Sequence, residues 1–547
     1  MKKQTGASPF RTNTGLQEAP ASTGRRGFLR GAGAAAGGLA VGALLPPGQS
    51  SQAFAAEPAA PAAAVAAQAE LDAQTRRILR WQGAPPANWT RTRAGVDHDV
   101  LIVGGGQSGV AIAYGLRRKG VSRVEVIDQA DPGQAGIWTT IARMQQLRTP
   151  KTLPGPEHEN AALGFRAWYE TLHGAAAFDA LDRIPRVAWA DYIAWFQKVT
   201  GTQVRYRTRL VDIEPQGELL RLQLESDGVR RAVTVRKLVL ASGYAGAGGP
   251  SVPRFVRQLP SAVWAHSSTP IDFRKLAGKS VAIIGAGASG FDAAGAALEA
   301  GAAQVHLFSR DPYLNYTNAP VAQPAPAPAP APDRGHAPLT EMADELPDAV
   351  RWRDFLQRDR RIASVPLDSL QRAVRFDNFN VYIKSEWTEA GIDRAGKVMG
   401  KIAGKTRKFD YLILGTGYRI DLALQPELMH IHSAIALWGD RYRPEPGEES
   451  AAGSAHPYLG RGFEFLPREP AAAEYLRNIH CFNLAASVSF GIPVGDVPST
   501  VHQPGLVAAI ATDLFLGDLD VAAHRRYALA PDPVPDAAAY QKALRTI

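Results

Sequence analysis

A glycine-rich turn between a short apolar strand and a helix is the feature that most constrains the fold of this chain. The stretch Asp99–Gly109 reads Asp-Val-Leu-Ile-Val-Gly-Gly-Gly-Gln-Ser-Gly, and a helix is predicted over 110–119. In Gly-x-Gly-x-x-Gly spacing the first glycine makes a tight turn, the second lets a pyrophosphate approach the backbone, and the third lets helix and strand pack closely. The residues of this turn that we predict to bind a dinucleotide are Gly104, Gly106, Gln107, Ser108 and Gly109.

The strand that follows favours a dinucleotide site over a glycine turn that binds nothing. The predicted strand 124–127 ends in Asp128, nineteen residues after Gly109. A carboxylate at that place accepts hydrogen bonds from an adenosine ribose but repels a 2′-phosphate. We therefore expect the first turn to bind a dinucleotide with a free 2′-hydroxyl, such as FAD or NAD.

The same order of elements recurs later in the chain with the opposite charge at its end. A strand over 280–284 leads into Gly285-Ala286-Gly287-Ala288-Ser289-Gly290, a helix over 291–300 and a strand over 305–308. Arg310 follows that strand, where an arginine holds a 2′-phosphate through charge-assisted hydrogen bonds and so favours NADP(H). The alternative is an arginine that only faces solvent. The residues assigned to this second site are Gly285, Gly287, Ser289, Gly290 and Arg310.

Further along, each glycine turn is matched by a strand that ends in a small-residue turn, and we assign Ser242, Gly243, Thr416 and Gly417 in these turns to cofactor binding. We predict an α/β fold with two Rossmann-like three-layer dinucleotide-binding domains, the FAD domain being interrupted by the NADP domain. The predicted parts are a signal peptide (1–55), a linker with a short helix (56–95), the first FAD-domain part (96–260), the NADP domain (261–418) with an Ala-Pro insertion (319–333), and the C-terminal FAD-domain part (419–547).

The beginning of the chain has the order of regions found in a twin-arginine signal peptide. Arg25 and Arg26 stand in Thr-Gly-Arg-Arg-Gly-Phe-Leu-Arg, followed by a mildly apolar region over 31–45 and Ala-Phe-Ala over 53–55. The apolar region is too short to span a bilayer comfortably, so we expect no stable membrane insertion. The pattern predicts export by the twin-arginine route to a periplasmic or extracytoplasmic location.

The charge of the chain does not favour nucleic-acid binding, and its cysteine content excludes a disulfide or thiol reductase with a redox cysteine pair. The predicted signal holds six Lys or Arg against one acid, so the mature chain is left near +4 of the total +9, which gives no reason to expect a nucleic-acid partner. The chain has a single cysteine, Cys481, so it contains neither an internal disulfide nor a Cys-x-x-Cys redox pair. No metal site is predicted.

Several segments resemble the class B flavin-dependent monooxygenases, which include the flavin-containing, Baeyer–Villiger and ornithine/lysine N-hydroxylating enzymes. The two glycine motifs and Gly415-Thr416-Gly417-Tyr418 resemble the cofactor motifs of that group, and Gly136-Ile137-Trp138 resembles its Gly-Thr-Trp at the flavin. The proline-broken segment 144–151, interpreted as a loop near a ligand, resembles the N-hydroxylase segment beside the flavin ring. Trp264-Ala265-His266-Ser267 resembles the histidine part of the Baeyer–Villiger fingerprint, whose flanking residues this chain lacks.

The resemblance implies an NADPH-dependent monooxygenase with FAD and NADP(H) as cofactors and with dioxygen and a small organic molecule as substrates. In that group the reduced flavin takes up dioxygen as a C4a-(hydro)peroxide in a dry pocket, and the cofactor carries the difficult chemistry. The candidate catalytic residues are Arg148, Lys151 and His266. Additional candidate cofactor contacts are Gly136, Trp138 and Asp496.

Two alternatives stay open at this stage. Export points to a compartment where NADPH is scarce, so the protein is alternatively an exported FAD-dependent oxidase or dehydrogenase that takes electrons from its own substrate. A non-enzymatic flavin-binding protein is the third reading. The charge of Arg310 separates the first two readings, because only the NADPH-dependent enzyme needs it.

Overall fold

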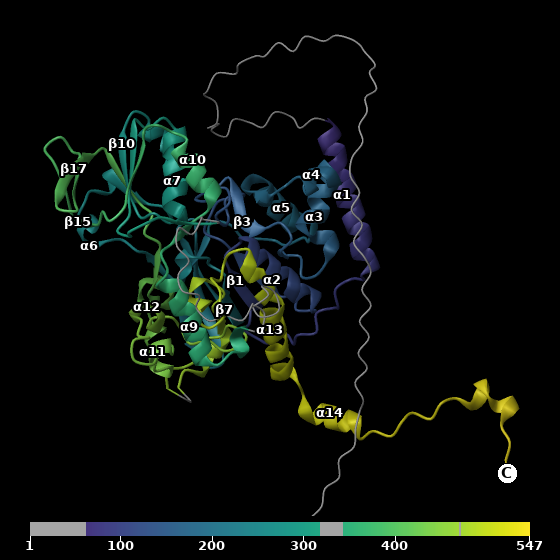
Figure 1. The fold of residues 1–547 in the computed structure, drawn as a ribbon. Helices are drawn as coiled ribbons and strands as arrows, with labels where there is room; N and C mark the ends of the chain where they lie inside the picture. Colours follow the sequence, from purple (N-terminus) through teal and green to yellow (C-terminus); the bar gives the residue numbers. More distant parts are fainter. Residues whose placement is uncertain (1–61, 318–342, 470–471, 547) are drawn as a thin grey trace, which may run out of the picture. The chain divides into compact units, whose positions relative to one another are not determined.

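The computed structural model describes residues 62–317, 343–469 and 472–546 (Figure 1). The predicted signal peptide 1–55 and the Ala-Pro insertion 319–333 lie outside these residues. Among the described helices, none is both long and apolar enough to cross a membrane.

The first glycine turn belongs to a six-stranded mixed sheet. Strand β1 lies between β2 and β7 and pairs in parallel with both, and β7 continues into an antiparallel meander with β6 and β5. Val100, Leu101 and Ile102 of β1 are fully buried, as expected for a strand covered on both faces. The strands are β1 (His98–Val103), β2 (Val124–Ile127), β5 (Thr208–Gln216), β6 (Leu219–Ser226), β7 (Val229–Leu240) and β20 (Ile479–His480).

The C-terminal part of the chain returns to this first sheet. Strand β20 pairs in parallel with β7, with Ile479 opposite Leu238. Helix α13 (Gln503–Asp518) packs on helix α2 (Gln107–Arg118), where Val507 lies against Gly115 (Figure 1). The first sheet is therefore built from two parts of the chain, one before and one after the strands of the second sheet.

The second glycine turn belongs to a five-stranded parallel sheet in the order β14-β11-β10-β18-β9. Helices α7 (Ala288–Glu299) and α10 (Leu367–Val374) cover one face, and a small antiparallel sheet covers the other (Figure 1). The strands are β9 (Trp264–His266), β10 (Ser280–Ile284), β11 (Gln304–Phe308), β14 (Phe379–Tyr382) and β18 (Tyr411–Leu414), with β15 (Trp387–Ile392), β16 (Val398–Ile402) and β17 (Lys405–Phe409) in the covering sheet.

The segment interpreted as a loop over 144–151 is a strand instead. Residues Gln146–Pro150 form β3, which pairs antiparallel with β4 (Arg183–Pro185) across an irregular register. Proline breaks a helix but is tolerated at the end of an edge strand, which explains the correction. The pair leads into α5 (Arg186–Val199), whose aromatic face joins a buried cluster with Trp138.

Candidate functional site

The two glycine turns have the same geometry, although they lie in different sheets. At Gly104 the backbone is left-handed, with φ +111°, and a Cβ there would lie 2.3 Å from the carbonyl oxygen of Ala241. At Gly285 φ is +105°, and a Cβ would lie 2.4 Å from the carbonyl oxygen of Gly415. Each turn therefore fits under the end of a neighbouring parallel strand, β7 or β18, only because it has no side chain there.

Both turns leave the start of a helix open to a ligand. The N-cap residues are Gly106 for α2 and Gly287 for α7, and neither helix start has a side-chain cap. The first N–H groups of a helix have no partner within the helix and attract anions. Gly136 lies against Gly106, where a Cβ on Gly106 would be 3.3 Å from the Cα of Gly136. These positions suit the phosphates of two dinucleotides.

The acid Asp128 follows strand β2, and the base Arg310 lies just after strand β11, as the sequence predicts. The Asp128 carboxylate accepts hydrogen bonds from the backbone N–H groups of Gly105 at 2.7 Å and Ala130 at 2.8 Å, so it is fixed beside the first turn. Arg310 is exposed at the end of β11 and forms no hydrogen bond or ion pair with the described residues. Among the described residues, no group therefore competes with a phosphate for this guanidinium.

Two buried amides test whether the first site fits FAD. Gln107 is 6% exposed; its Oε1 accepts hydrogen bonds from the indoles of Trp138 at 3.2 Å and Trp189 at 2.9 Å, but its Nε2 has no partner within the described part of the chain. Gln503, the first residue of α13, is 1% exposed, and neither of its amide atoms has a partner there. Since buried amides without partners cost about 1–3 kcal/mol each, these residues fit a polar ligand such as FAD.

Asp496 lies where the C-terminal part meets the turn after β7. Gly495 packs on this turn, since a Cβ on Gly495 would lie 3.3 Å from the Cα of Gly243. The Asp496 carboxylate accepts a hydrogen bond from the hydroxyl of Tyr244 at 3.2 Å and one from the backbone N–H of Ser499 at 3.3 Å. Burial raises the pKa of Asp496 to about 6. This carboxyl group therefore changes its charge close to neutral pH. The Ser242 hydroxyl, at the same turn, is bound by the amide of Asn483 at 3.2 Å.

Arg148 connects the first sheet region to the second. Its guanidinium pairs with Asp292 of α7 at 2.5 Å, and Ser369 donates to the other oxygen of Asp292 at 2.7 Å. Burial raises the pKa of Asp292 despite the opposing charge of Arg148. The positive charge of Arg148 also acts on the Tyr244 hydroxyl, where it opposes the rise in pKa that burial causes. This predicted catalytic candidate therefore lies at the junction between the two cofactor turns.

Lys151 contacts helix α4 and takes no part in the contacts of Arg148. Its ammonium group donates to the carbonyl oxygens of Phe178 and Asp179 at 2.9 Å each and sits 4.9 Å from the centre of the Phe178 ring. These contacts anchor the end of α4 (Ala175–Asp179) to the segment after β3. The structure thus separates Lys151 from Arg148 and gives it a packing contact.

His266 ends β9 and is 2% exposed. Burial lowers its pKa to about 4, and the nearby charge of Arg143 acts in the same direction. Its ring lies 5.8 Å from that of Tyr418, which follows the turn Thr416-Gly417. His266 is therefore a neutral residue beside the turn that closes the second sheet.

Two tyrosines of the junction were missed in the sequence. Tyr244 follows Ser242-Gly243, and Tyr418 follows Thr416-Gly417; their rings meet edge to face at 5.7 Å and 90°. The signal was a repeated Gly-Tyr after each strand-ending turn, which the sequence contains twice. Arg143 was also missed, although it donates to the carbonyl oxygens of Ser267 and Thr269 just after β9.

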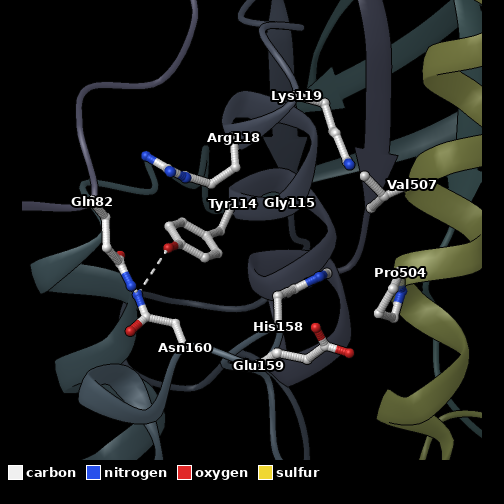
Figure 2. A pocket seen from close by; sticks show the side chains of 10 residues that line it. All are labelled: Gln82, Tyr114, Gly115, Arg118, Lys119, His158, Glu159, Asn160, Pro504 and Val507. Atoms are coloured by element: carbon white, nitrogen blue, oxygen red, sulfur yellow. Dashed lines mark hydrogen bonds between the residues drawn. The ribbon is translucent and has the colours of Figure 1, made fainter.

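A separate pocket of about 550 Å³ lies over the C-terminal half of α2 (Figure 2). Figure 2 shows the Tyr114 hydroxyl bound by the Asn160 amide, with His158 and Glu159 below it. None of the residues predicted to bind cofactor lines this pocket. It is lined by Gln82, Tyr114, Gly115, Arg118, Lys119, His158, Glu159, Asn160, Pro504 and Val507.

Two strand–glycine turn–helix units, one followed by a strand that ends in an acid and one by a strand that ends in a base, define an oxidoreductase with two dinucleotide sites. Residues 98–325 match the family model described as pyridine nucleotide-disulphide oxidoreductase. The chain is also 39% identical to the FAD-dependent urate hydroxylase of Xanthomonas campestris pv. campestris over 438 residues. This match covers 79% of this chain and 89% of that protein. The chain belongs to the family of this FAD-dependent hydroxylase and is an FAD-dependent oxidoreductase.

Solved structures agree on the fold. The ornithine hydroxylase of Pseudomonas aeruginosa superposes with a TM-score of 0.59 at 19% identity, covering 76% of this chain and 99% of that chain. The L-lysine 6-monooxygenase of Pseudomonas syringae gives a TM-score of 0.56 at 18% identity, again covering 76% and 99%. The predictions of the fold class, of FAD and of an enzyme are confirmed, and the non-enzymatic reading is excluded.

Proposed function

We propose that the protein is an NADPH-dependent flavin monooxygenase that hydroxylates urate or a closely related purine lactam. The observation that carries this proposal is the 39% identity to the FAD-dependent urate hydroxylase of Xanthomonas campestris across 89% of that protein. The substrate class therefore comes from the relative, and the residues that serve it come from the structure.

The first site supplies the binding of FAD. The start of α2 presents its N–H groups to the pyrophosphate, Asp128 is fixed to accept hydrogen bonds from the ribose, and the Gln107 and Gln503 amides offer polar contacts. Bound FAD supplies the transfer of electrons from NADPH to dioxygen that a hydroxylation requires. The chain's own residues bind, orient and shield the reacting molecules.

The second site favours NADPH over NADH. Lys384 follows β14, the neighbour of β11, and its backbone N–H donates to the carbonyl of Asp311 at 2.9 Å, so it lies beside Arg310. Both side chains are exposed, and neither pairs with an acid among the described residues. Two cations without an acidic partner in the described part of the chain suit a 2′-phosphate, which NADH lacks.

The junction offers charge and proton-holding groups to a purine lactam. Arg148 keeps 40% of its side chain exposed while it pairs with Asp292, so part of its guanidinium stays open to an anion. The hydroxyl of Tyr244, bound to Asp496, is placed to hold or release a proton at its oxygen. A large aromatic cluster that includes Trp138 and Trp189 excludes water from one side of the first turn.

Export remains part of the proposal. The twin-arginine pattern favours a protein that is exported after folding around its cofactor, and it is the observation that supports the second candidate, an exported oxidase that does not use NADPH. Cell fractionation with Arg25→Lys and Arg26→Lys together tests this point. Loss of the protein from the extracytoplasmic fraction is expected, and unchanged distribution would contradict export by this route.

Turnover tests the function directly. The purified FAD-loaded protein is mixed with urate and air in the presence of NADPH or NADH, and the loss of urate absorbance and the uptake of oxygen are recorded. The proposal predicts coupled consumption of urate, oxygen and NADPH in equal amounts. Consumption of urate without any nicotinamide nucleotide would favour the oxidase, and NADPH oxidation unaffected by urate would exclude urate as the substrate.

A further inference from the structure

His266 is a buried imidazole whose Nε2 has no hydrogen-bond partner within the described residues. It is 2% exposed and lies opposite Leu414 where the parallel strands β9 and β18 end. A buried polar group in this state is unusual in native structures and is explained by a partner that binds it. The carbonyl oxygen of Gly417 faces the ring and accepts the backbone N–H of Ser251 at 2.9 Å, but it does not meet His266 Nε2 in hydrogen-bonding geometry.

The hydrogen bonds on the other side of the ring fix its tautomer. The backbone N–H of Ser268 points to His266 Nδ1 at 3.1 Å, and the Ser268 hydroxyl lies 2.8 Å from the same atom. A backbone N–H can only donate, so Nδ1 is the acceptor and the proton of the neutral ring is on Nε2. His266 therefore presents an N–H donor that no acceptor among the described residues meets in hydrogen-bonding geometry.

The location of this donor identifies the partner. In parallel sheets ligands bind outside the carboxyl ends of the strands, and β9, β18 and β10 all end at this edge. Strand β10 leads into the second glycine turn, so a dinucleotide bound there passes this edge. Tyr418, 5.8 Å from the His266 ring, connects this place to Tyr244 and the flavin side of the junction.

We propose that His266 donates a hydrogen bond from Nε2 to an oxygen of the bound nicotinamide nucleotide and that Ser268 is the positioning residue that holds its tautomer. The carboxamide, ribose and phosphate oxygens of such a nucleotide are all acceptors. The inference rests on the proposed use of NADPH and names a contact of that same site. It assigns His266 to nucleotide binding, and no proton transfer is involved.

Two substitutions at His266 separate this contact from a packing role. The amide nitrogen of glutamine reaches the place of Nε2, whereas that of asparagine reaches only the place of Nδ1. Calorimetric titration of the FAD-loaded protein with NADP⁺ should show binding about 3- to 10-fold weaker in His266→Asn and within about twofold of wild type in His266→Gln. His306→Asn is the matched control, since His306 lies in the same sheet with its ring stacked on Tyr382, and it should leave NADP⁺ binding unchanged.

Nitrogen NMR of the histidine rings gives a readout that does not depend on turnover. The protein should show His266 in the Nε2–H tautomer, and NADP⁺ should shift this signal and not that of His306. An Nδ1–H tautomer, a signal that NADP⁺ does not move, or wild-type affinity in His266→Asn would overturn the inference while leaving the NADPH proposal intact. Failure of the wild-type protein to bind NADP⁺ would overturn both, so the two failures are distinguishable.

Discussion

A single added methyl group at the third glycine of each turn should disable one cofactor site and spare the other. A Cβ at Gly109 would lie 1.8 Å from the carbonyl oxygen of Gly104, and one at Gly290 would lie 2.0 Å from that of Gly285. Because a Cβ does not approach another heavy atom to less than 3.0 Å, helix α2 or α7 must move away from its turn by about 1 Å.

The size of the effect follows from the hydrogen bonds at the helix start. A displacement of about 1 Å takes an N–H···O bond of normal length beyond the range of hydrogen bonding. Each charge-assisted bond to a phosphate contributes about 1.5–3 kcal/mol, so the loss of two such bonds weakens binding by about 3–6 kcal/mol. This corresponds to roughly 10²- to 10⁴-fold in the dissociation constant.

Flavin content and flavin reduction report the two sites separately. Gly109→Ala should purify with little FAD, as read from flavin absorbance per protein. Gly290→Ala should remain yellow with the wild-type FAD content, but its anaerobic reduction should require roughly 10²-fold more NADPH. Thermal melts followed by circular dichroism check that both variants fold. A fully flavinated Gly109→Ala or a folded but colourless Gly290→Ala would refute the assignment of the two turns.

Three further predictions test single groups. Arg310→Ala should lower the preference for NADPH over NADH in flavin reduction by about 10- to 100-fold through its effect on NADPH alone, and equal losses with both nucleotides would contradict a 2′-phosphate contact. The pH profile of kcat/KM should change near pH 6, where Asp496 ionises, and Asp496→Asn should remove that change; a profile that keeps it assigns the change to another group. Burial of the Glu125 carboxylate raises its pKa, but hydrogen bonds from His98 and Arg205 outweigh this effect and lower the pKa to about 2. The ionised carboxylate therefore contributes about 3 kcal/mol to the free energy of unfolding. This contribution is present above pH 4.5, the unfolded-state pKa, and is lost as the pH falls toward 2. Glu125→Gln should therefore flatten the acid limb of stability measured by urea unfolding, and an unchanged limb would contradict this.

The local parts of the fold were predictable because their signals lie within short stretches of sequence. The glycine turn at Gly104, the acid at Asp128 and the base at Arg310 each depend on spacing within one strand–turn–helix unit, and each stands where the sequence places it. Helix α13 begins at Gln503, with Pro504 in its first turn, where proline is favoured. Burial on both faces of β1 follows from its uninterrupted apolar run.

The junction was not predictable in the same way, because its contacts join distant parts of the chain. The pairs Arg148–Asp292 and Tyr244–Asp496 are 144 and 252 residues apart, and no local pattern relates their members. Strand β3 was wrongly interpreted as a loop, because its partner β4 is a separate segment and the register between the two strands is irregular. Lys151 was predicted as a catalytic candidate from its place in a local basic segment, but its ammonium group binds two carbonyl oxygens at the end of helix α4.

Anaerobic mixing of the purified protein with NADPH in a stopped-flow spectrophotometer tests the central claim, that one chain holds FAD at the first turn and a phosphorylated nicotinamide nucleotide at the second. The account predicts that the flavin absorbance disappears at a rate that saturates with NADPH and that is at least about 10-fold slower at the same concentration of NADH. A flavin that stays oxidised with either nucleotide would contradict it.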